Sequence, residues 1–374
     1  MASIKRRDNG SWRARYRDAA GKEHAKHFPR KVDAQAWLDE VTASLVTGRY
    51  VDPRAGRITF DTWWADWSAR QVWARGTLEA AQQAAASVTF GDLPMSALRA
   101  SHVEVWVKSM SQPAASRKGG LAASTIKTRV TYVRMALSAA VRDRVIPEDP
   151  SSRVPLPRIR KAEASMAIPT ARGVGEALRE APEWFAPFIG VCAFAGLRLG
   201  EAAGLQLADI DFLRRTIRID RQVQGATSKA VEIVPPKYGS ERTVYAPEAL
   251  TKMLARHVEV FGTRGEEEWL FCAPSGDLWN RNSAGNQWRQ IRDAVGLGAH
   301  TLHDLRHFYA SGLIADGCDV VTVQRALGHS SPTITLGTYS HLWPTAEDRT
   351  RSAAAELMAA AVEDSADSVR TQAT

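Results

Sequence analysis

The spacing of apolar residues changes twice along this chain, and each change limits what the next segment can fold into. Within residues 4–28, the segment 12–17 alternates apolar and polar side chains between two turn signals, as a half-buried strand does, whereas residues 58–146 repeat apolar side chains at helical spacing. From residue 166 onward the two patterns are mixed. The chain of 374 residues is also two to three times the usual length of a domain. These observations predict a multidomain protein that is mainly α with small β-sheets.

Residues 1–56 predict a domain made of a three-stranded sheet and a helix at 32–47, with turn signals at 8–10 and 19–22 separating the strands. One face of the middle strand is apolar (Trp12, Ala14, Tyr16) and the other is basic (Arg13, Arg15, Arg17). Because so small a sheet buries only one face, we expect the helix to cover the apolar one. Three neighbouring guanidinium groups without an interleaved carboxylate repel one another, so the basic face is predicted to bind phosphates. A solvated charged face is the alternative.

Residues 57–146 predict a domain of four helices, at 59–72, 77–88, 101–110 and 124–145. Ser101 and Glu104 have the spacing of a capping box at the start of the third helix. The loop between the last two helices carries Arg117 and Lys118 beside two glycines. This flexible basic loop is suited to phosphate contact, with a solvated loop as the alternative.

The positive charge is concentrated in the N-terminal part of the chain. Residues 1–160 contain 27 Lys+Arg and 15 Asp+Glu, a net charge of +12, although the whole chain has only +8. Residues 147–165 contain four prolines and four basic residues and predict an extended linker that runs along a polyanion. Such asymmetry points to nucleic acid or to a membrane surface. No apolar run reaches the roughly 18 residues needed to cross a bilayer, which disfavours the membrane.

The N-terminus and the cysteines indicate a cytoplasmic protein. The first residues, MASIKRRDNGSW, lack the apolar core of a signal peptide. The three cysteines, Cys192, Cys272 and Cys318, are far apart and form no CxxC pair. This pattern excludes a disulfide framework or a cysteine zinc site and fits a reducing compartment.

Residues 166–345 predict an α+β domain, followed by an alanine-rich tail at 346–374. The strands are expected at 216–219, 231–234 and 242–246, with the last two forming a hairpin around residues 235–241. The expected helices are 170–181, 185–195, 200–205, 247–261, 281–295, 303–316, 320–327 and 332–342.

This domain contains a set of residues that points to chemistry on a phosphodiester. The set is Arg198 in GLRLGE, Lys237 in PKYGSER, His303 and Arg306 in HDLRH, His329 in LGHSS, and Tyr339. Arginine forks match phosphate oxygens, lysine and histidine can transfer protons, and a tyrosine hydroxyl can attack phosphorus. Surrounding cations would favour the phenolate and so lower the pKa of the tyrosine.

Mechanisms that require a metal or a nucleotide lack their residues. His303 and His307 are four apart, as in the zinc motif HExxH, but the second position is Asp304 and no third ligand is evident. No GxxxxGK[ST] loop and no dense carboxylate group are present. We therefore expect neither a metal nor another cofactor.

Together these five separated segments resemble the signature of the tyrosine recombinases, the phage integrase family. The resemblance covers about residues 165–345. The N-terminal sheet is similar to the arm-type DNA-binding domain of phage integrases, and residues 57–146 are similar to their core-binding domain.

The resemblance implies a role for each residue of the set. Tyr339 would attack the scissile phosphate, giving a 3′-phosphotyrosyl link and a free 5′-hydroxyl. Arg198 and Arg306 would bind the non-bridging oxygens, and Lys237 would protonate the departing 5′-oxygen. His303 would take up the tyrosine proton and His329 would hold the phosphoryl group. Glu201 and His307 would support the site.

The implied function is site-specific integration and excision of DNA at attachment sites in the bacterial cytoplasm, at the nucleoid. The implied partners are double-stranded DNA and a homotetramer, with a possible excisionase and a host DNA-bending factor. A C-terminal segment at 353–362 would pass between neighbouring copies. A type IB topoisomerase, a chromosome-dimer resolvase and a DNA-binding protein without enzymatic activity are the alternatives.

Overall fold

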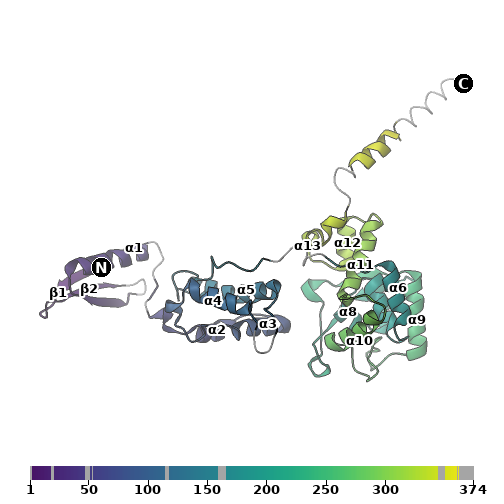
Figure 1. Cartoon of the computed structure of the whole chain (residues 1–374), viewed down its shortest axis with the longest axis horizontal. Helices are drawn as coiled ribbons and strands as arrows, with labels where there is room; N and C mark the ends of the chain where they lie inside the picture. The colour runs from purple at the N-terminus through teal and green to yellow at the C-terminus, as the bar shows by residue number, and fades with distance from the viewer. Residues whose placement is uncertain are drawn as a thin grey trace. The chain divides into compact units, whose positions relative to one another are not determined.

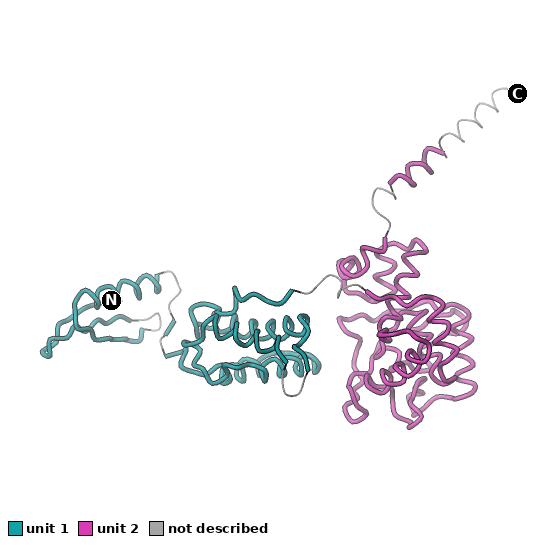
Figure 2. Tube along the Cα trace, in the orientation of Figure 1, with its two compact units in different colours: residues 1–164 teal, residues 165–374 magenta. Residues whose placement is uncertain are grey.

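The computed structural model describes residues 2–17, 21–46, 51–52, 54–113, 118–158, 166–343, 350–359 and 361. The chain divides into two compact units, residues 1–164 and residues 165–374 (Figure 2). Each unit has its own hydrophobic core, and the two are described separately below.

The N-terminal sheet forms as the sequence predicts (Figure 1). Its antiparallel strands are β1 (Ser3–Arg6), β2 (Trp12–Arg17) and β3 (Glu23–Phe28), in the order β1-β2-β3. Helix α1 (Lys31–Val46) covers the apolar face, where Ala14 and Tyr16 pack with Leu38. The edge of Trp37 lies against the ring of Tyr16, with 5.4 Å between ring centroids.

The helical region of the first unit has a tryptophan-rich core. Its helices are α2 (Phe60–Ser68), α3 (Arg75–Ala85), α4 (Ala100–Met110) and α5 (Ala123–Arg142). The indole nitrogen of the buried Trp63 donates to the Ala136 carbonyl at 2.9 Å, which fixes α2 against α5. The predicted capping box at Ser101 is wrong. The helix begins one residue earlier, and the His102 ring accepts the Arg99 backbone N–H, so His102 takes the role expected of Glu104.

The first part of the expected linker packs against the helical region. Val154 is buried in its core. The Arg134 guanidinium on α5 donates to the carbonyl oxygens of Ser151 and Val154, each at 2.9 Å. Residues 147–156 are therefore not the extended linker that the prolines predict, because their backbone carbonyls accept from the partly buried guanidinium of Arg134. Residues 159–165 lie outside the described part.

The second unit is built around a wholly apolar helix, α7 (Ala186–Phe194), whose residues Pro187–Ala193 are all buried. The other helices of the unit, several of which pack directly on α7, are α6 (Ala171–Glu180), α8 (Leu199–Ala203), α9 (Glu248–Phe261), α10 (Arg281–Ala294), α11 (Leu302–Ala315), α12 (Val320–Leu327) and α13 (Pro332–Tyr339). Their starts follow ordinary capping chemistry: Asp319, for example, accepts the backbone N–H of Val321 at 2.7 Å.

Two small antiparallel sheets lie in the same unit. One has the order β4 (Ile210–Asp211), β5 (Thr216–Ile219), β8 (Arg242–Tyr245), and the other pairs β6 (Gln222–Gln224) with β7 (Glu232–Val234). The predicted hairpin of the last two strands is therefore wrong. Strand β8 pairs with β5 because both bury a residue at the same register position, Ile217 opposite Val244. The more exposed β7 pairs with the short β6, which the sequence did not reveal.

Beyond α13, residues 350–359 are helical and exposed, including Leu357 and Met358. These residues form most of the segment at 353–362 that was expected to pass between copies, and residue 362 lies outside the described part. No helix within the described ranges is long and apolar enough to cross a membrane.

Candidate active site

Most of the predicted catalytic residues meet where four segments of the second unit converge. Arg198 immediately precedes α8, and Arg306 lies on α11 with His303 and His307. His329 follows the end of α12, and Tyr339 is the last residue of α13. The contacts described below connect all of them except Lys237.

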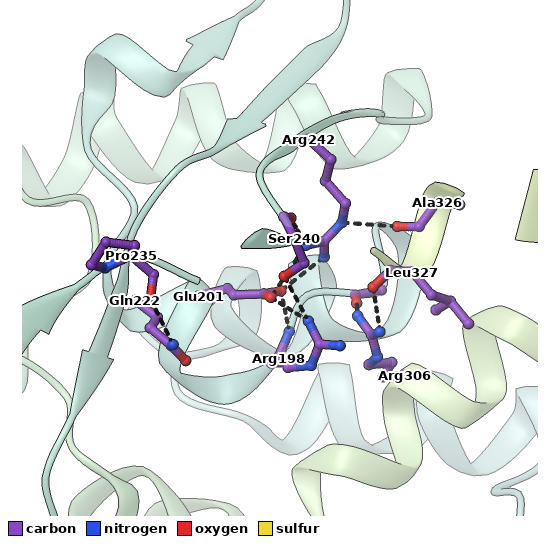
Figure 3. A network of polar contacts seen from close by, with 10 residues as sticks. Arg198, Glu201, Gln222, Pro235, Ser240, Arg242, Arg306, Ala326 and Leu327 are labelled. Carbon is purple, nitrogen blue, oxygen red and sulfur yellow. Dashed lines mark hydrogen bonds and ion pairs between the residues drawn. The ribbon is translucent and has the colours of Figure 1, made fainter. Parts of the chain in front are cut away.

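Glu201 is the centre of the polar network shown in Figure 3. Its side chain is only 1 % exposed and accepts hydrogen bonds from two arginines. Arg198 donates from Nη1 to Oε1 at 2.6 Å and from its backbone N–H to Oε2 at 2.9 Å. Arg242 donates from Nη1 to Oε1 at 3.2 Å and from Nη2 to Oε2 at 2.8 Å. This geometry supports the bracing role expected of Glu201.

The charge state of Glu201 follows from these contacts. Burial by itself would raise the pKa of the carboxyl, but the hydrogen bonds and charge of Arg242, with Arg198 and Arg306, lower it to about 2. A permanently ionised carboxylate therefore faces three guanidinium groups. The positive charge that remains is available to an anion in front of Arg198, whose side chain keeps 23 % of its surface accessible.

Arg306 is buried and bound by backbone carbonyl groups. Its Nη1 donates to the Gly196 carbonyl at 2.6 Å, and its Nη2 donates to the Leu327 carbonyl at the end of α12. Burial and the charge of Arg198 lower the pKa of Arg306 to about 9, which leaves the group charged at neutral pH. At 1 % exposure, Arg306 is much less accessible than Arg198.

Tyr339 is also buried, at 1 % exposure. Its hydroxyl lies 2.7 Å from His307 Nδ1, and its ring is stacked on His329 at 6.4 Å between centroids. The sequence predicts a lowered pKa for this tyrosine, and that expectation is wrong for the unbound protein. Burial raises the pKa of Tyr339 to about 12, and the opposing effects of Arg306 and Arg198 are too small to reverse the shift.

The histidines near Tyr339 are held in their neutral form. His329 Nδ1 lies 2.9 Å from the Thr335 hydroxyl, and the edge of the His303 ring meets His307 at 4.7 Å between centroids. Desolvation, with the charges of nearby cations, lowers the pKa of His303 and of His329 to about 4. The Tyr339 hydroxyl proton is within reach of His307, whereas the family resemblance implies uptake by His303.

Lys237 lies apart from this cluster, on the exposed turn Lys237–Gly239 between β7 and β8. The next residue of the turn, Tyr238, adopts a left-handed backbone with φ +62°. The turn ends at Ser240, whose hydroxyl accepts from Arg198 Nη1 at 3.4 Å. Lys237 is thus attached to the site through a short segment that begins beside Arg198.

The basic face of the N-terminal sheet has a counter-ion that the strand pattern does not show. Glu23 on β3 lies 3.4 Å from Arg13 and 3.6 Å from Arg15. The predicted repulsion between the guanidinium groups is therefore wrong for two of the three arginines, because a carboxylate on the neighbouring strand offsets their charge. Arg17 and Lys118 are exposed, and Arg117 lies outside the described residues.

Sequence reasoning missed Arg242, although it lies in the quoted segment PKYGSER. Its side chain is 6 % exposed, and the pattern of a short polar segment does not indicate such burial. Tyr309, a second tyrosine on α11 near Arg306, packs against Gly196. The described residues contain no group of three or more His, Cys, Asp or Glu that could hold a metal ion.

Comparisons with known proteins agree with this geometry. Residues 166–345 match the family model described as the phage integrase family. A tyrosine recombinase XerC-like protein of Caldanaerobacter subterraneus is 30% identical over 40% of this chain and 43% of its own length. The ICEBs1 integrase of Bacillus subtilis is 26% identical over 60% of this chain and 63% of its own length. The chain thus spans less than two thirds of these two relatives.

Solved structures show the same fold. A Tn1549 transposon integrase in complex with a circular intermediate DNA superposes with a TM-score of 0.68 at 19% identity, over 80% of this chain and 99% of that one. A lambda integrase dimer bound to a core site superposes with a TM-score of 0.56 at 16% identity, over 90% and 93% of the two chains.

The second unit, with its arginines, histidines and tyrosine converging from four segments, has the architecture of a tyrosine recombinase. Residues 166–345, just under half of the chain, match the phage integrase family.

Proposed function

We propose that this protein is a site-specific DNA recombinase that cleaves and rejoins strands through a 3′-phosphotyrosyl intermediate. The observation that carries the proposal is the convergence of Tyr339 with Arg198, Arg306 and His329 in a domain of this family. Arg198 and Arg306 bind the non-bridging oxygens and stabilise the charge that builds in the transition state. Tyr339 attacks phosphorus, and Lys237 protonates the 5′-oxygen that leaves.

Strand cleavage at this site requires a conformational change. Tyr339 has to leave its buried position and lose a proton that His307 Nδ1 is placed to accept. The phosphotyrosyl bond preserves the energy of the phosphodiester, so a 5′-hydroxyl from another strand reverses the step without ATP. His303 and His329 are neutral at pH 7, so they can act as hydrogen-bond donors or acceptors beside the phosphate.

The partners follow from the same proposal. The N-terminal domain at 1–56 binds arm-type sites, and the helical domain at 57–146 binds the core site. The segment at 159–165 and its flanks join these two domains to the catalytic domain at 166–345. The C-terminal tail at 346–374 contacts a neighbouring copy. A lambda integrase tetramer bound to a Holliday junction shares this fold, with a TM-score of 0.57. We therefore propose a homotetramer on attachment-site DNA, in the cytoplasm of a bacterial host at the nucleoid, assisted by an excisionase and a host DNA-bending factor.

The proposal is tested with Tyr339→Phe on a nicked suicide substrate that contains a candidate attachment site. The wild-type chain should form a covalent adduct, visible as a band of lower mobility in a denaturing gel. The variant should lose the adduct while its binding to the same DNA changes by less than about 1 kcal/mol, since only a hydroxyl is removed.

Tyr309→Phe is the matched control, because this tyrosine packs against Gly196. An adduct that persists in Tyr339→Phe would refute the assignment. Relaxation of supercoiled DNA by the wild-type chain, without exchange between two sites, would favour the type IB topoisomerase alternative.

A further inference from the structure

Arg242 is a buried cation that has no role in the proposed mechanism and is not among the residues predicted from the sequence. It begins β8, opposite Ile219 of β5, and its side chain is 6 % exposed. All three of its nitrogen atoms donate to the protein: Nη1 and Nη2 to Glu201, Nη1 also to the Ser240 carbonyl at 3.2 Å, and Nε to the Ala326 carbonyl at 3.0 Å. These contacts fix the guanidinium plane completely.

The contacts of Arg242 restrict the position of the Arg198 side chain. Arg198, which precedes Glu201 in the sequence, and Arg242, which follows it, both donate hydrogen bonds to the carboxylate of Glu201. Arg198 retains accessible surface, whereas Arg242 retains very little. The inner arginine therefore occupies one side of the carboxylate, and the outer arginine is left oriented toward the solvent, where a phosphate can approach.

The same side chain attaches the site to the segment that carries the nucleophile. Ala326 and Leu327 end α12, and their carbonyl oxygens accept from Arg242 and Arg306 respectively. Cations are favoured at a helix C-terminus because the carbonyl groups there lack partners. The next residue, Gly328, has φ +62°, and a Cβ there would lie 2.9 Å from Arg242 Cδ. His329 follows directly and contacts α13, which ends at Tyr339.

We propose that Arg242 is a positioning residue for strand cleavage: it holds Glu201, and through Glu201 it orients Arg198, while it fixes the end of α12 beside them. The inference rests on the proposed recombinase function. Arg242 itself does not touch the phosphate. Its replacement should slow the chemical step without weakening DNA binding.

The electrostatics provide a readout that a purely structural role would lack. Glu201 faces Arg198 on its own turn, Arg242 from β8, Arg306 from α11 and the thiol of Cys192 from α7. The hydrogen bond and charge of Arg242 are the main causes that lower the pKa of Glu201. Without Arg242 this pKa rises, so acid conditions protonate Glu201 and release Arg198.

The experiment measures the rate of adduct formation on the nicked substrate between pH 6 and pH 8. Adduct formation by the wild-type chain is measured first on the same DNA, which separates failure of the proposed function from failure of this inference. Arg242→Gln should be slower by about 10- to 100-fold, the effect expected when a catalytic group is displaced by about 1 Å. Its rate should fall further toward pH 6. Arg242→Lys keeps the positive charge but not the forked guanidinium, and its rate should lie between those of the wild-type chain and of Arg242→Gln.

Two further variants make the result decisive. In the double variant Glu201→Gln/Arg242→Gln, the extra loss toward pH 6 should disappear, and the rate should be within about twofold of Glu201→Gln, because the two residues act as one unit. Arg256→Gln is the control, since Arg256 on α9 pairs with Glu183 and Glu259 and not with Glu201. It should leave the rate and its pH dependence unchanged at comparable thermal stability. Additive rate losses, or a pH profile of Arg242→Gln parallel to that of the wild-type chain, would overturn the proposal.

Discussion

At the scale of single residues, the site keeps the tyrosine hydroxyl and its histidine neighbours uncharged and largely enclosed. Tyr339 is protonated because of burial, and its hydroxyl has a neutral imidazole as partner. His329 stays neutral because the protein excludes water from it and because Arg306 and Arg198 are near. The residue types of this set could be identified from the sequence. Their protonation states could not, since each depends on burial that only the folded chain defines.

This arrangement predicts a stability that depends on pH. In the folded protein His329 takes up a proton only near pH 4, whereas in the unfolded chain it does so near pH 6.5. The unfolded state therefore binds more protons between these values, and the free energy of unfolding falls as the pH is lowered from 7 to 5. Urea unfolding followed by circular dichroism should show this fall.

His329→Gln, which can still contact Thr335, should reduce the slope of that fall. His341→Gln, at an exposed position, serves as the control and should leave the slope as in the wild-type chain. A His329→Gln variant with the wild-type slope would contradict the explanation.

At the scale of elements, the helices and the first sheet could be predicted from the sequence, but the strand pairing in the second unit could not. Amphipathic spacing and capping residues act within one segment, so α12 was predicted at its observed bounds, residues 320–327. Strand partners depend on which faces are buried together, and proximity in sequence wrongly favoured β7 with β8. The same limit hid Arg242 and the role of Glu23, since their partners lie on other elements: Glu201 on α8 for Arg242, and Arg13 and Arg15 on β2 for Glu23.

The end of α12 provides a test at this scale. Gly328 caps the helix in the left-handed region, and an added Cβ would also press against Arg242 and Ser240. Gly328→Ala should lower the free energy of unfolding by about 1–3 kcal/mol and slow adduct formation, because backbone strain and displacement of Arg242 combine.

Gly296→Ala is matched for the backbone, since Gly296 has φ +67° but open space around its Cα. It should show the strain alone, with unchanged adduct formation. Equal effects of the two substitutions on the cleavage rate would mean that contact with Arg242 is unimportant.

At the scale of the whole molecule, the positive charge and the chemistry belong to different units. The first 160 residues carry +12, and the rest of the chain is slightly acidic. The catalytic unit thus relies on a few converging cations, whereas the first unit has the charge for salt-dependent contacts along a DNA backbone.

Removal of residues 1–56 should therefore eliminate footprints at distal sites and leave the core-site footprint intact. The triple variant Arg13→Gln/Arg15→Gln/Arg17→Gln leaves the apolar face of the sheet unchanged and is the finer test, with circular dichroism to check that the variant is folded. In binding assays at several salt concentrations, its log–log salt slope should be smaller by about 0.9 for each arginine that contacts a phosphate. Loss of the core-site footprint together with the distal ones would show that the two regions do not bind separately.

The enclosed position of Tyr339 has a consequence for the genome in which such a protein works. If strand cleavage requires Tyr339 to leave this position, as the proposed function implies, a molecule on an arbitrary DNA sequence would nick it only in proportion to the fraction of molecules in which the tyrosine is out. Occupancy of the wrong sequence would then be harmless unless that sequence also favoured the opened form. The frequency of unwanted breaks would be limited by a conformational equilibrium within the catalytic domain and not by the affinity of the other domains for DNA.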